Sequence, residues 1–338
     1  MRIRRQAMFN SVKQQGFRAV LLLAAVAGSV AAMPKAAYAA YPEKPIQLIL
    51  SFPPAGATDI LARAIGQGLS EKLNTQVIVD NRPGAGGNIG LAAAAKAPAD
   101  GYTIYLAAVT NAAIAAAAYS SAPAHLVKDF DAIAGVATVP HMLVVPASVP
   151  AKSVGELISF LKSAPGKHNF ASQGTGTLSH LESEIFKEST KVDIVHIPYK
   201  GSSQALPDLI AGSSTMMFDS IPASMPHVKS GKLRVLAVAS GKRVGSLPDV
   251  PTVQESGVKG FEANNLFGFT APKGTPPEAI KTLAEALESV VASPVLKQRM
   301  SEQGVELEYT PPKPFAKMVR QEFKTWGKAV EQAGIKLD

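Results

Sequence analysis

The sequence predicts an α/β protein built from two lobes. Apolar runs typical of strands alternate with segments of helical periodicity along nearly the whole chain, which is the pattern of sheets covered by helices. The chain has 338 residues, and 299 remain once a predicted export signal is removed, a length that suits two hydrophobic cores better than one. Ligands of such sheets bind at the carboxyl ends of parallel strands, so a site is expected in the loops that follow the strands.

An export signal is predicted over residues 1–39. Basic residues precede an apolar run from Ala19 to Ala32, and Ala37-Tyr38-Ala39 is a cleavage site of the small-x-small type. A membrane anchor is the alternative, but about 14 apolar residues are too few for a hydrocarbon core that needs roughly 20. The Arg4-Arg5 pair leaves twin-arginine export open, although the following residues fit the general secretory route better.

Charge and cysteine content exclude several classes of protein. The formal net charge is +8, but the predicted signal contains six Lys and Arg and no acidic residue, so the remaining chain carries only +2. No block of like charges marks a nucleic-acid-binding tail. Cysteine is absent, which excludes a disulfide framework, thiol catalysis and cysteine metal sites.

The first strand and helix after the signal show the alternating pattern clearly. The strand-forming run at residues 46–52 ends at Pro53-Pro54, and apolar residues then recur at helical spacing from Ile60 to Leu73. Thr58 or Asp59 is placed to cap or charge the start of that helix. A strand, a loop and a helix are therefore expected in this order.

The same unit recurs along the rest of the chain. Further strands are predicted at residues 76–79, 103–107, 169–171, 193–197, 216–219 and 235–239. Further helices are predicted at residues 88–97, 154–161, 178–186, 205–210, 277–292, 294–303 and 314–333.

Two apolar stretches, at residues 142–145 and 266–269, can carry the chain from one lobe to the other and back. The first lobe is accordingly expected to contain residues 40–142 and 266–338, and the second lobe residues 143–265. A lobe made from both ends of the chain, with the middle inserted, is a hinged arrangement.

Several donor-rich loops are candidates for ligand contacts. Residues 52–59 (FPPAGATD) join a strand to a helix whose free amide groups can hold an anion, although a plain turn with a capped helix would give the same pattern. Residues 81–90 (NRPGAGGNIG) depart from the dinucleotide-binding spacing, which favours a tightly packed turn. Hydroxyl and glycine donors also gather at residues 172–177, 198–203 and 218–222.

Catalytic and metal-binding patterns are not found. The sequence has no G-x-S-x-G elbow, and the six histidines show none of the spacings of metal sites. His180 and Glu184 can share a helix face, but such a pair is usually a surface contact. No enzyme activity, cofactor or metal is expected, and an exported α/β enzyme such as a hydrolase is kept as the alternative.

Seven blocks of sequence, in the same order, resemble the Bug (TctC-like) extracytoplasmic solute receptors of tripartite tricarboxylate transporters. The blocks are YPEKPI at 41–46, FPPAGATD at 52–59, VDNRPGAGGNIG at 79–90, DGYT at 100–103, PYKGS at 198–202, LPDVPT at 247–252 and APKGTP at 271–276. The resemblance implies a periplasmic, monomeric binding protein of the type II Venus flytrap kind. It further implies a ligand that is a di- or tricarboxylate, an amino acid or an aromatic acid, and delivery of that ligand to a membrane permease.

The resemblance and the loops together give one set of candidate ligand-binding residues. Backbone amides and hydroxyls are expected to hold the ligand, and two positions depart from the pattern of many members: Ala55 replaces a glycine, and Asn111 stands where a histidine is common. The candidates are Ala55, Gly56, Ala57, Thr58, Asp59, Asn88, Thr110, Asn111, Ser172, Thr175, Gly176, Tyr199 and Asp219.

Overall fold

The computed structural model of the protein describes residues 41–337. The predicted export signal at residues 1–39 lies outside this range. From Pro42 onward the chain forms one compact unit. Among the described residues, no helix is both long enough and apolar enough to cross a membrane.

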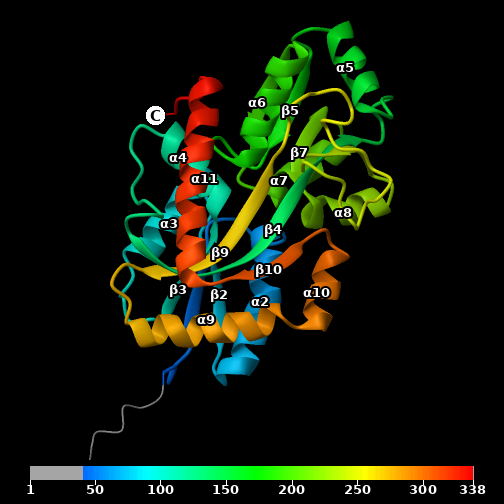
Figure 1. Ribbon diagram of the computed structural model, residues 1–338. Coiled ribbons are helices and arrows are strands. Elements are labelled where there is room, and N and C mark those ends of the chain that lie inside the picture. Colours follow the sequence, from blue (N-terminus) through cyan, green and yellow to red (C-terminus); the bar gives the residue numbers. More distant parts are fainter. Residues whose placement is uncertain (1–40, 338) are drawn as a thin grey trace, which may run out of the picture. The chain divides into compact units, whose positions relative to one another are not determined.

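Two mixed β-sheets form the framework and share one long strand, β4 (Figure 1). The first sheet joins the parallel strands β2, β1 and β3 to β9, β4 and β10, which pair antiparallel. The second joins the parallel strands β6, β5 and β7 to β4 and β8, which also pair antiparallel. The bounds are β1 Ile46–Leu50, β2 Val77–Asn81, β3 Thr103–Ala108, β4 Phe130–Pro146, β5 His168–Ser172, β6 Ile194–Pro198, β7 Met216–Ser220, β8 Leu233–Val238, β9 Asn264–Pro272 and β10 Glu306–Thr310.

Helices follow most of the strands, as the alternating sequence pattern predicts. The helix α2, for example, buries its apolar residues Leu61, Ile65 and Leu69 and ends at Asn74, which adopts a left-handed conformation. The helices are α2 Ala57–Leu73, α3 Asn88–Ala95, α4 Val109–Ala118, α5 Val154–Ser163, α6 Leu178–Thr190, α7 Ser202–Ile210, α8 Ile221–Lys229, α9 Pro277–Val291, α10 Pro294–Ser301 and α11 Pro312–Gln332, with a 3₁₀ turn η1 at Ala85–Gly87.

The strands β4 and β9 join the two halves of the molecule and lie side by side (Figure 1). β4 pairs with β9 as far as Pro140, and from His141 onward it pairs with β7. Because the chain runs outward along β4 and returns along β9, these two strands are necessarily antiparallel. We call the first sheet, with the helices that follow its strands, the first lobe. The second sheet, with the helices that follow its strands, is the second lobe, and β4 belongs to both sheets. The α/β class with two lobes is therefore confirmed, and the antiparallel pairs come from the connecting strands and from β8 and β10.

Three elements were not expected from the sequence, each for a physical reason. The helix α4 is rich in small residues that are nearly all buried, so it has no amphipathic period. The helix α8 contains Pro222 and Pro226, which disfavour a helix in sequence-based assignment. The strand β10 is short and half exposed, with no clear apolar alternation.

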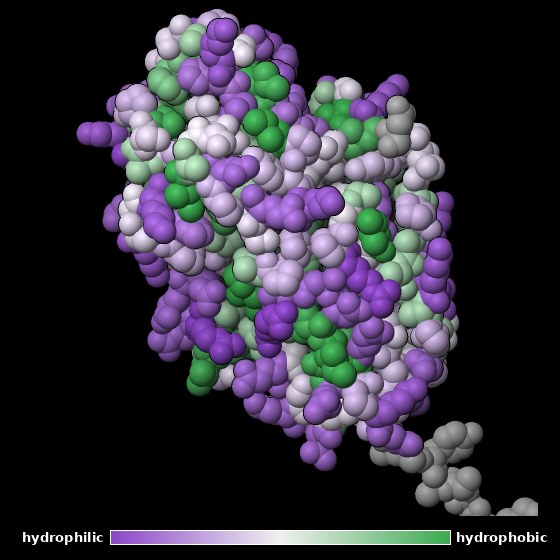
Figure 2. All heavy atoms as spheres, turned by 180° about the vertical axis from the view of Figure 1, so that it is seen from behind, coloured by the Kyte–Doolittle hydropathy of each residue, from purple (hydrophilic) through white to green (hydrophobic). Residues whose placement is uncertain are grey.

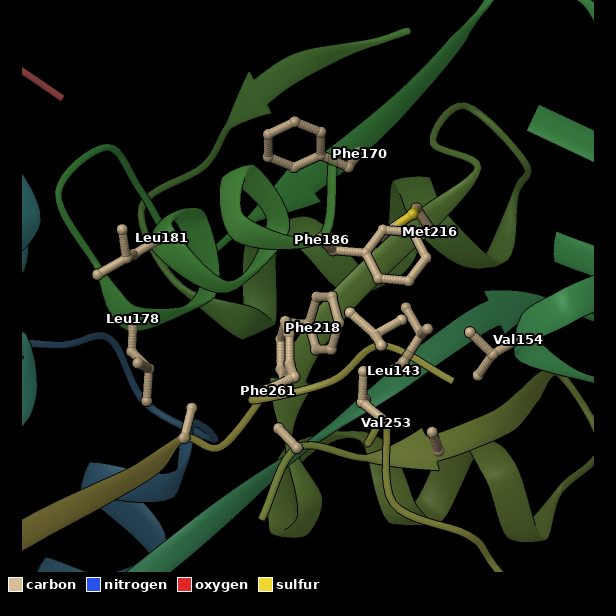
Figure 3. Close-up of a cluster of buried hydrophobic side chains, with 14 of the residues drawn as sticks. Leu143, Val154, Phe170, Leu178, Leu181, Phe186, Met216, Phe218, Val253 and Phe261 are labelled. Atoms are coloured by element: carbon tan, nitrogen blue, oxygen red, sulfur yellow. The ribbon is translucent and has the colours of Figure 1, made fainter. Parts of the chain in front are cut away.

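A hydrophobic cluster lies mainly in the second lobe (Figure 3). Phe218 is fully buried there, with its ring centroid 5.9 Å from that of Phe186 and 5.2 Å from that of Phe261. Trp326 and Val330 of the C-terminal helix α11 belong to the same cluster. The C-terminal helix therefore contributes to the second-lobe core, and the expected boundary, which assigns residues 266–338 to the first lobe, stays a prediction.

Hydrophilic side chains cover most of the face seen in Figure 2, and the hydrophobic ones form small separate groups. The large hydrophobic side chains that are exposed, such as Ile78, Val195 and Val295, come from different elements. Scattered apolar residues of this kind are usual on the surface of a folded protein.

Candidate functional site

A cavity lies where the two lobes meet the connecting strands. Its volume is about 20 Å³, room for little more than one water molecule, so the lobes must move apart to admit a larger ligand. Loop residues of both lobes and side chains of β4 and β9 form its walls. The lining residues are Phe52, Pro53, Gly56, Ala57, Thr58, Asn111, Val139, His141, Gln173, Gly201, Ser202, Ser220, Asn265 and Phe267.

Four helices begin at this cavity, two from each lobe. The helices α2, α7 and α8 begin directly after Gly56, Gly201 and Ser220, and Asn111 lies in the first turn of α4. None of these four helix starts has a side-chain cap hydrogen bond. Apart from Pro222 of α8, which has no N–H, their first residues have amide groups that no side-chain cap uses, and the positive ends of the helix dipoles favour an anion.

Two buried polar atoms at the cavity have no hydrogen-bond partner among the described residues. They are Ser220 Oγ and Asn265 Oδ1, and their residues are 1% and 3% exposed. Leaving such an atom unpaired costs about 1–3 kcal/mol, and a bound polar molecule would offset this cost. The cavity thus offers unused hydrogen-bonding capacity from side chains as well as from helix amides.

Asp219 supports the cavity wall from behind. Its Oδ1 accepts hydrogen bonds from Gln173 Nε2 and Ser202 Oγ, each at 2.7 Å, and its Oδ2 accepts one from Ser224 Oγ. The carboxylate is fully buried and does not line the cavity. Its role in the structure is to fix Gln173 and Ser202, which do line it.

Asp59 has a similar supporting position in the first lobe. Its carboxylate accepts hydrogen bonds from Ala55 N at 3.1 Å and Asn81 Nδ2 at 3.1 Å, and it forms an ion pair with Arg63 at 2.9 Å. Burial alone would raise the pKa of Asp59, but the hydrogen bonds from Arg63, Ala55 and Asn81 outweigh it and lower the pKa. Asp59 is therefore ionised, and it holds the loop before α2 in place.

His141 is the ionisable side chain of the cavity wall. Its Nδ1 lies 2.6 Å from Glu182 Oε2, and both residues are 1% exposed. Burial alone would lower the pKa of His141, but the Glu182 carboxylate outweighs this effect and raises it. Burial raises the pKa of Glu182 as well. Both groups of the pair therefore hold their protons to higher pH than they would in water.

The two lobes touch around the cavity. Leu178 N, at the start of α6, donates a hydrogen bond of 2.7 Å to Asn111 Oδ1 across the interface. A Cβ atom on Gly201 would lie 2.6 Å from the ring of Pro53, which shows how closely the lobes approach each other. The chain therefore adopts a closed arrangement in which the cavity walls come from both lobes.

A second hollow adjoins the cavity and shares Phe52 and Gln173 with it. It is lined by the glycine-rich turn at residues 84–87 together with Tyr119, Thr175, Tyr199 and Lys200. Tyr119 Oη donates a hydrogen bond to Thr175 O at 3.4 Å, so this hollow also lies where the lobes meet.

The candidate residues from the sequence fall into three groups. The first group lines the cavity and consists of Gly56, Ala57, Thr58 and Asn111. The second group, Thr175 and Tyr199, lines the adjoining hollow. The remaining candidates line neither space, and they are Ala55, Asp59, Asn88, Thr110, Ser172, Gly176 and Asp219.

Several cavity residues were missing from the candidates. Gln173, Ser202 and Ser220 belong to the donor-rich loops found in the sequence, so a closer reading of those loops could have included them. His141 and Asn265 belong to the connecting strands, and no local pattern in the sequence marks them.

The remaining histidines give no sign of metal chemistry in the described part of the chain, where no group of three or more possible ligands occurs. His180 Nε2 and Glu184 Oε1 lie 3.9 Å apart, which is a weak contact. The rings of His180 and His196 stack at 4.1 Å, and burial lowers the pKa of His180 to about 4 and that of His196 to about 3. Both imidazoles are therefore neutral near pH 7.

A mixed-sheet α/β fold with two lobes, and a cavity of helix N-termini between them, define a solute-binding receptor of the periplasmic binding protein class. Residues 61–335 match the family described as "Tripartite tricarboxylate transporter family receptor", and the chain belongs to this family. This family consists of receptors, which supports the expectation of a binding protein in place of an enzyme.

Relatives and solved structures agree with this assignment. BugT of Bordetella pertussis is 36% identical over 298 residues, which cover 88% of this chain and 91% of BugT. The solved structure of Rpa4515 from R. palustris with adipate matches with a TM-score of 0.84 and 34% identity, covering 88% of this chain and 99% of the other. The periplasmic binding protein BugD matches with a TM-score of 0.84 and 33% identity, over the same shares of the two chains.

Proposed function

We propose that the protein captures a small carboxylate in the cavity between its lobes and delivers it to a permease of a tripartite tricarboxylate transporter. The convergence of four uncapped helix starts on one closed cavity carries this proposal. No Asp or Glu lines the cavity, so its wall carries no negatively charged side chain. The adipate bound to the similar Rpa4515 supports a carboxylate ligand here.

The binding mode follows from the geometry. A carboxylate at the helix starts would accept hydrogen bonds from backbone amides near Gly56 and Gly201, and from hydroxyls such as those of Thr58 and Ser220. Hydrogen bonds to a charged group contribute about 1.5–3 kcal/mol each, so a few of them stabilise the closed arrangement. Opening breaks the contact between Asn111 and Leu178 and exposes the ligand to the permease.

We further propose that the chain is exported through its N-terminal signal, acts in the periplasm and works as a monomer. The family assignment supports export and action in the periplasm. The lobe boundaries at residues 142–143 and 265–266 belong to the same proposal, because β4 and β9 carry the chain between the lobes there.

A thermal-shift screen of the mature protein tests the proposal. Mono-, di- and tricarboxylates, aliphatic and aromatic, are compared with sugars, inorganic ions and peptides. A ligand present at a hundredfold its dissociation constant stabilises the folded state by about 2.7 kcal/mol, so a carboxylate that fits should raise the melting temperature by several degrees. If another class of metabolite raises the melting temperature and no carboxylate does, the proposal is wrong.

The variant Thr58→Val connects the screen to the cavity. Thr58 lines the cavity at the first turn of α2 and is 5% exposed. The substitution keeps the shape and removes the hydroxyl, so affinity for the best carboxylate should fall about three- to tenfold. Thr325→Val, on the exposed side of α11, is the matched control and should leave affinity unchanged. Equal affinity of Thr58→Val and the control would remove this helix start from the site.

A further inference from the structure

The wall of the cavity formed by the connecting strands differs chemically from the walls formed by the lobes. The lobes contribute helix starts, whereas β4 and β9 contribute Val139, His141, Asn265 and Phe267. His141 is also the first residue of β4 that pairs with the second lobe, after Pro140 ends the pairing with β9. A ligand held by the helix starts would therefore have its remaining part available to a separate set of side chains that includes His141.

Among the described residues that line the cavity, His141 is the only one whose side chain can carry a charge near neutral pH. Its Nδ1 is bound to Glu182 Oε2 at 2.6 Å, which leaves Nε2 as the nitrogen that can meet a ligand. Among the described residues, the bond to Glu182 is the only side-chain hydrogen bond of His141. Neither a lysine nor an arginine lines the cavity there.

The surroundings of His141 favour its protonated form. Glu182 on α6 faces it directly, Asp219 on β7 adds a second negative charge nearby, and no cation acts on it from the elements packed around it. Although burial opposes a charge on His141, these two carboxylates raise the pKa of His141. An imidazolium in this position donates from Nε2 and cannot accept a hydrogen bond.

We propose that His141 determines the ligand specificity of this cavity, because its imidazolium, held by Glu182, donates an Nε2–H hydrogen bond to a second anionic or acceptor group on the carboxylate ligand. This inference rests on the proposed function and narrows it. Acids with a second carboxylate are accepted, whereas acids with an ammonium group at the far end meet a positive charge and are rejected. Glu182 is a positioning residue, since it acts through His141 and does not line the cavity.

A matched series of ligands tests the specificity. For chains of four, five and six carbons, the diacid, the monoacid and the ω-amino acid are compared by calorimetry, for example glutarate, pentanoate and 5-aminopentanoate. At the length that fits the cavity, the diacid should bind at least tenfold more tightly than the monoacid, and the amino acid should bind most weakly. Tighter binding of the ω-amino acid than of the diacid would overturn the proposal, because it would show that Nε2 accepts a hydrogen bond.

The variant His141→Gln tests the residue itself. It should weaken binding of the diacid at least tenfold and binding of the monoacid less than threefold, because only the diacid reaches Nε2. Equal losses for both acids, or none, would overturn the inference. If the wild-type protein binds no carboxylate at all, the proposed function is wrong as well. If it binds carboxylates but His141→Gln affects both acids equally, only the role of His141 is wrong. If His141→Gln does not fold, which circular dichroism reports, the wild-type ligand series and the pH profile below decide the question.

The pH dependence of binding tests the charge on His141. Wild-type affinity for the diacid should stay constant from about pH 6 and fall as the pH rises through the raised pKa of His141, while affinity for the monoacid stays nearly constant. Glu182→Gln should move the midpoint of this fall to lower pH, because the carboxylate that stabilises the imidazolium is gone. If the role of Glu182 were purely structural, Glu182→Gln would weaken binding of both acids without moving the midpoint. A midpoint at or below about pH 6.5, the ordinary value for histidine, or an equal fall for the diacid and the monoacid, would contradict the proposal.

Discussion

Individual residues show how the loop before α2 is held for binding. Ala55 has φ +66°, a left-handed conformation that favours glycine, and its amide donates to Asp59. The sequence placed both residues among the ligand-binding candidates, and in the structure the Asp59 carboxylate is engaged with Arg63 and Asn81. Asn81 lies 22 residues further along the chain, and only the folded sheet brings it to Asp59. A sequence pattern can find such a loop, but it cannot say which side chains face the ligand.

The variant Asp59→Asn should lower the free energy of unfolding by about 1–3 kcal/mol at pH 7, because it removes a buried charged acceptor. The pKa of Asp59 is lower in the folded state than in the unfolded state. The stabilisation by its carboxylate is therefore fully present above the unfolded pKa and is lost as the pH falls through the folded pKa. Urea unfolding at several pH values measures this effect. A difference between wild type and variant that stays constant down to about pH 2 would contradict it.

The replacement Ala55→Gly tests the backbone strain at the same loop. Glycine relieves a left-handed conformation that costs an alanine about 1 kcal/mol, while the unfolded chain gains freedom of a similar size. We therefore expect the free energy of unfolding to change by less than about 1 kcal/mol, in either direction. A loss greater than about 2 kcal/mol would show that the Ala55 methyl group contributes packing that its geometry does not suggest.

At the scale of elements, the amphipathic helices and the first parallel strands were predictable because each carries its own periodic pattern. The helices α4 and α8, which begin at the cavity or beside it, were not, because buried small residues and internal prolines hide their period. The C-terminal helix α11 was expected, but its packing against the second-lobe core was not. Its Glu322 Oε2 accepts a hydrogen bond of 2.6 Å from Thr110 Oγ1, which joins α11 to α4, and a second one of 2.9 Å from Trp326 Nε1 within α11.

The variant Trp326→Ala tests the position of α11. Trp326 is 8% exposed and belongs to the second-lobe cluster, so its truncation should lower the free energy of unfolding by about 3–5 kcal/mol. Val295→Ala, which truncates a side chain that is 78% exposed, is the control and should change the unfolding free energy by less than about 0.5 kcal/mol. Similar unfolding curves for the two variants would show that α11 does not pack as described.

For the whole molecule, the sequence predicted two lobes and two crossing segments, and these crossings lie within β4 and β9. It did not reveal that the crossing strands also line the ligand cavity. His141 and Asn265 lie more than a hundred residues apart, and they meet at one cavity only because β4 and β9 run side by side. Contacts of this kind depend on the closed arrangement of the lobes.

The variant Gly201→Ala should hinder closure. Gly201 has φ +122°, and an added Cβ atom would lie 2.6 Å from Pro53 of the other lobe. We expect affinity for the best carboxylate to fall at least tenfold, and small-angle scattering with ligand to show a more open form. Gly212→Ala is the matched control, since Gly212 also has a positive φ, of +81°, but its added Cβ atom would make only an ordinary contact, 3.7 Å from Ser148 Oγ. Equal affinities of the two variants would remove the lobe contact from the binding mechanism.

A crystal structure of the mature protein with its tightest-binding carboxylate tests the central claim most directly. We predict that the carboxylate oxygens lie within hydrogen-bonding distance of backbone amides at the starts of α2, α7 or α8, between the two lobes. A carboxylate bound instead to Lys200 in the adjoining hollow, with the helix starts unoccupied, would contradict the account.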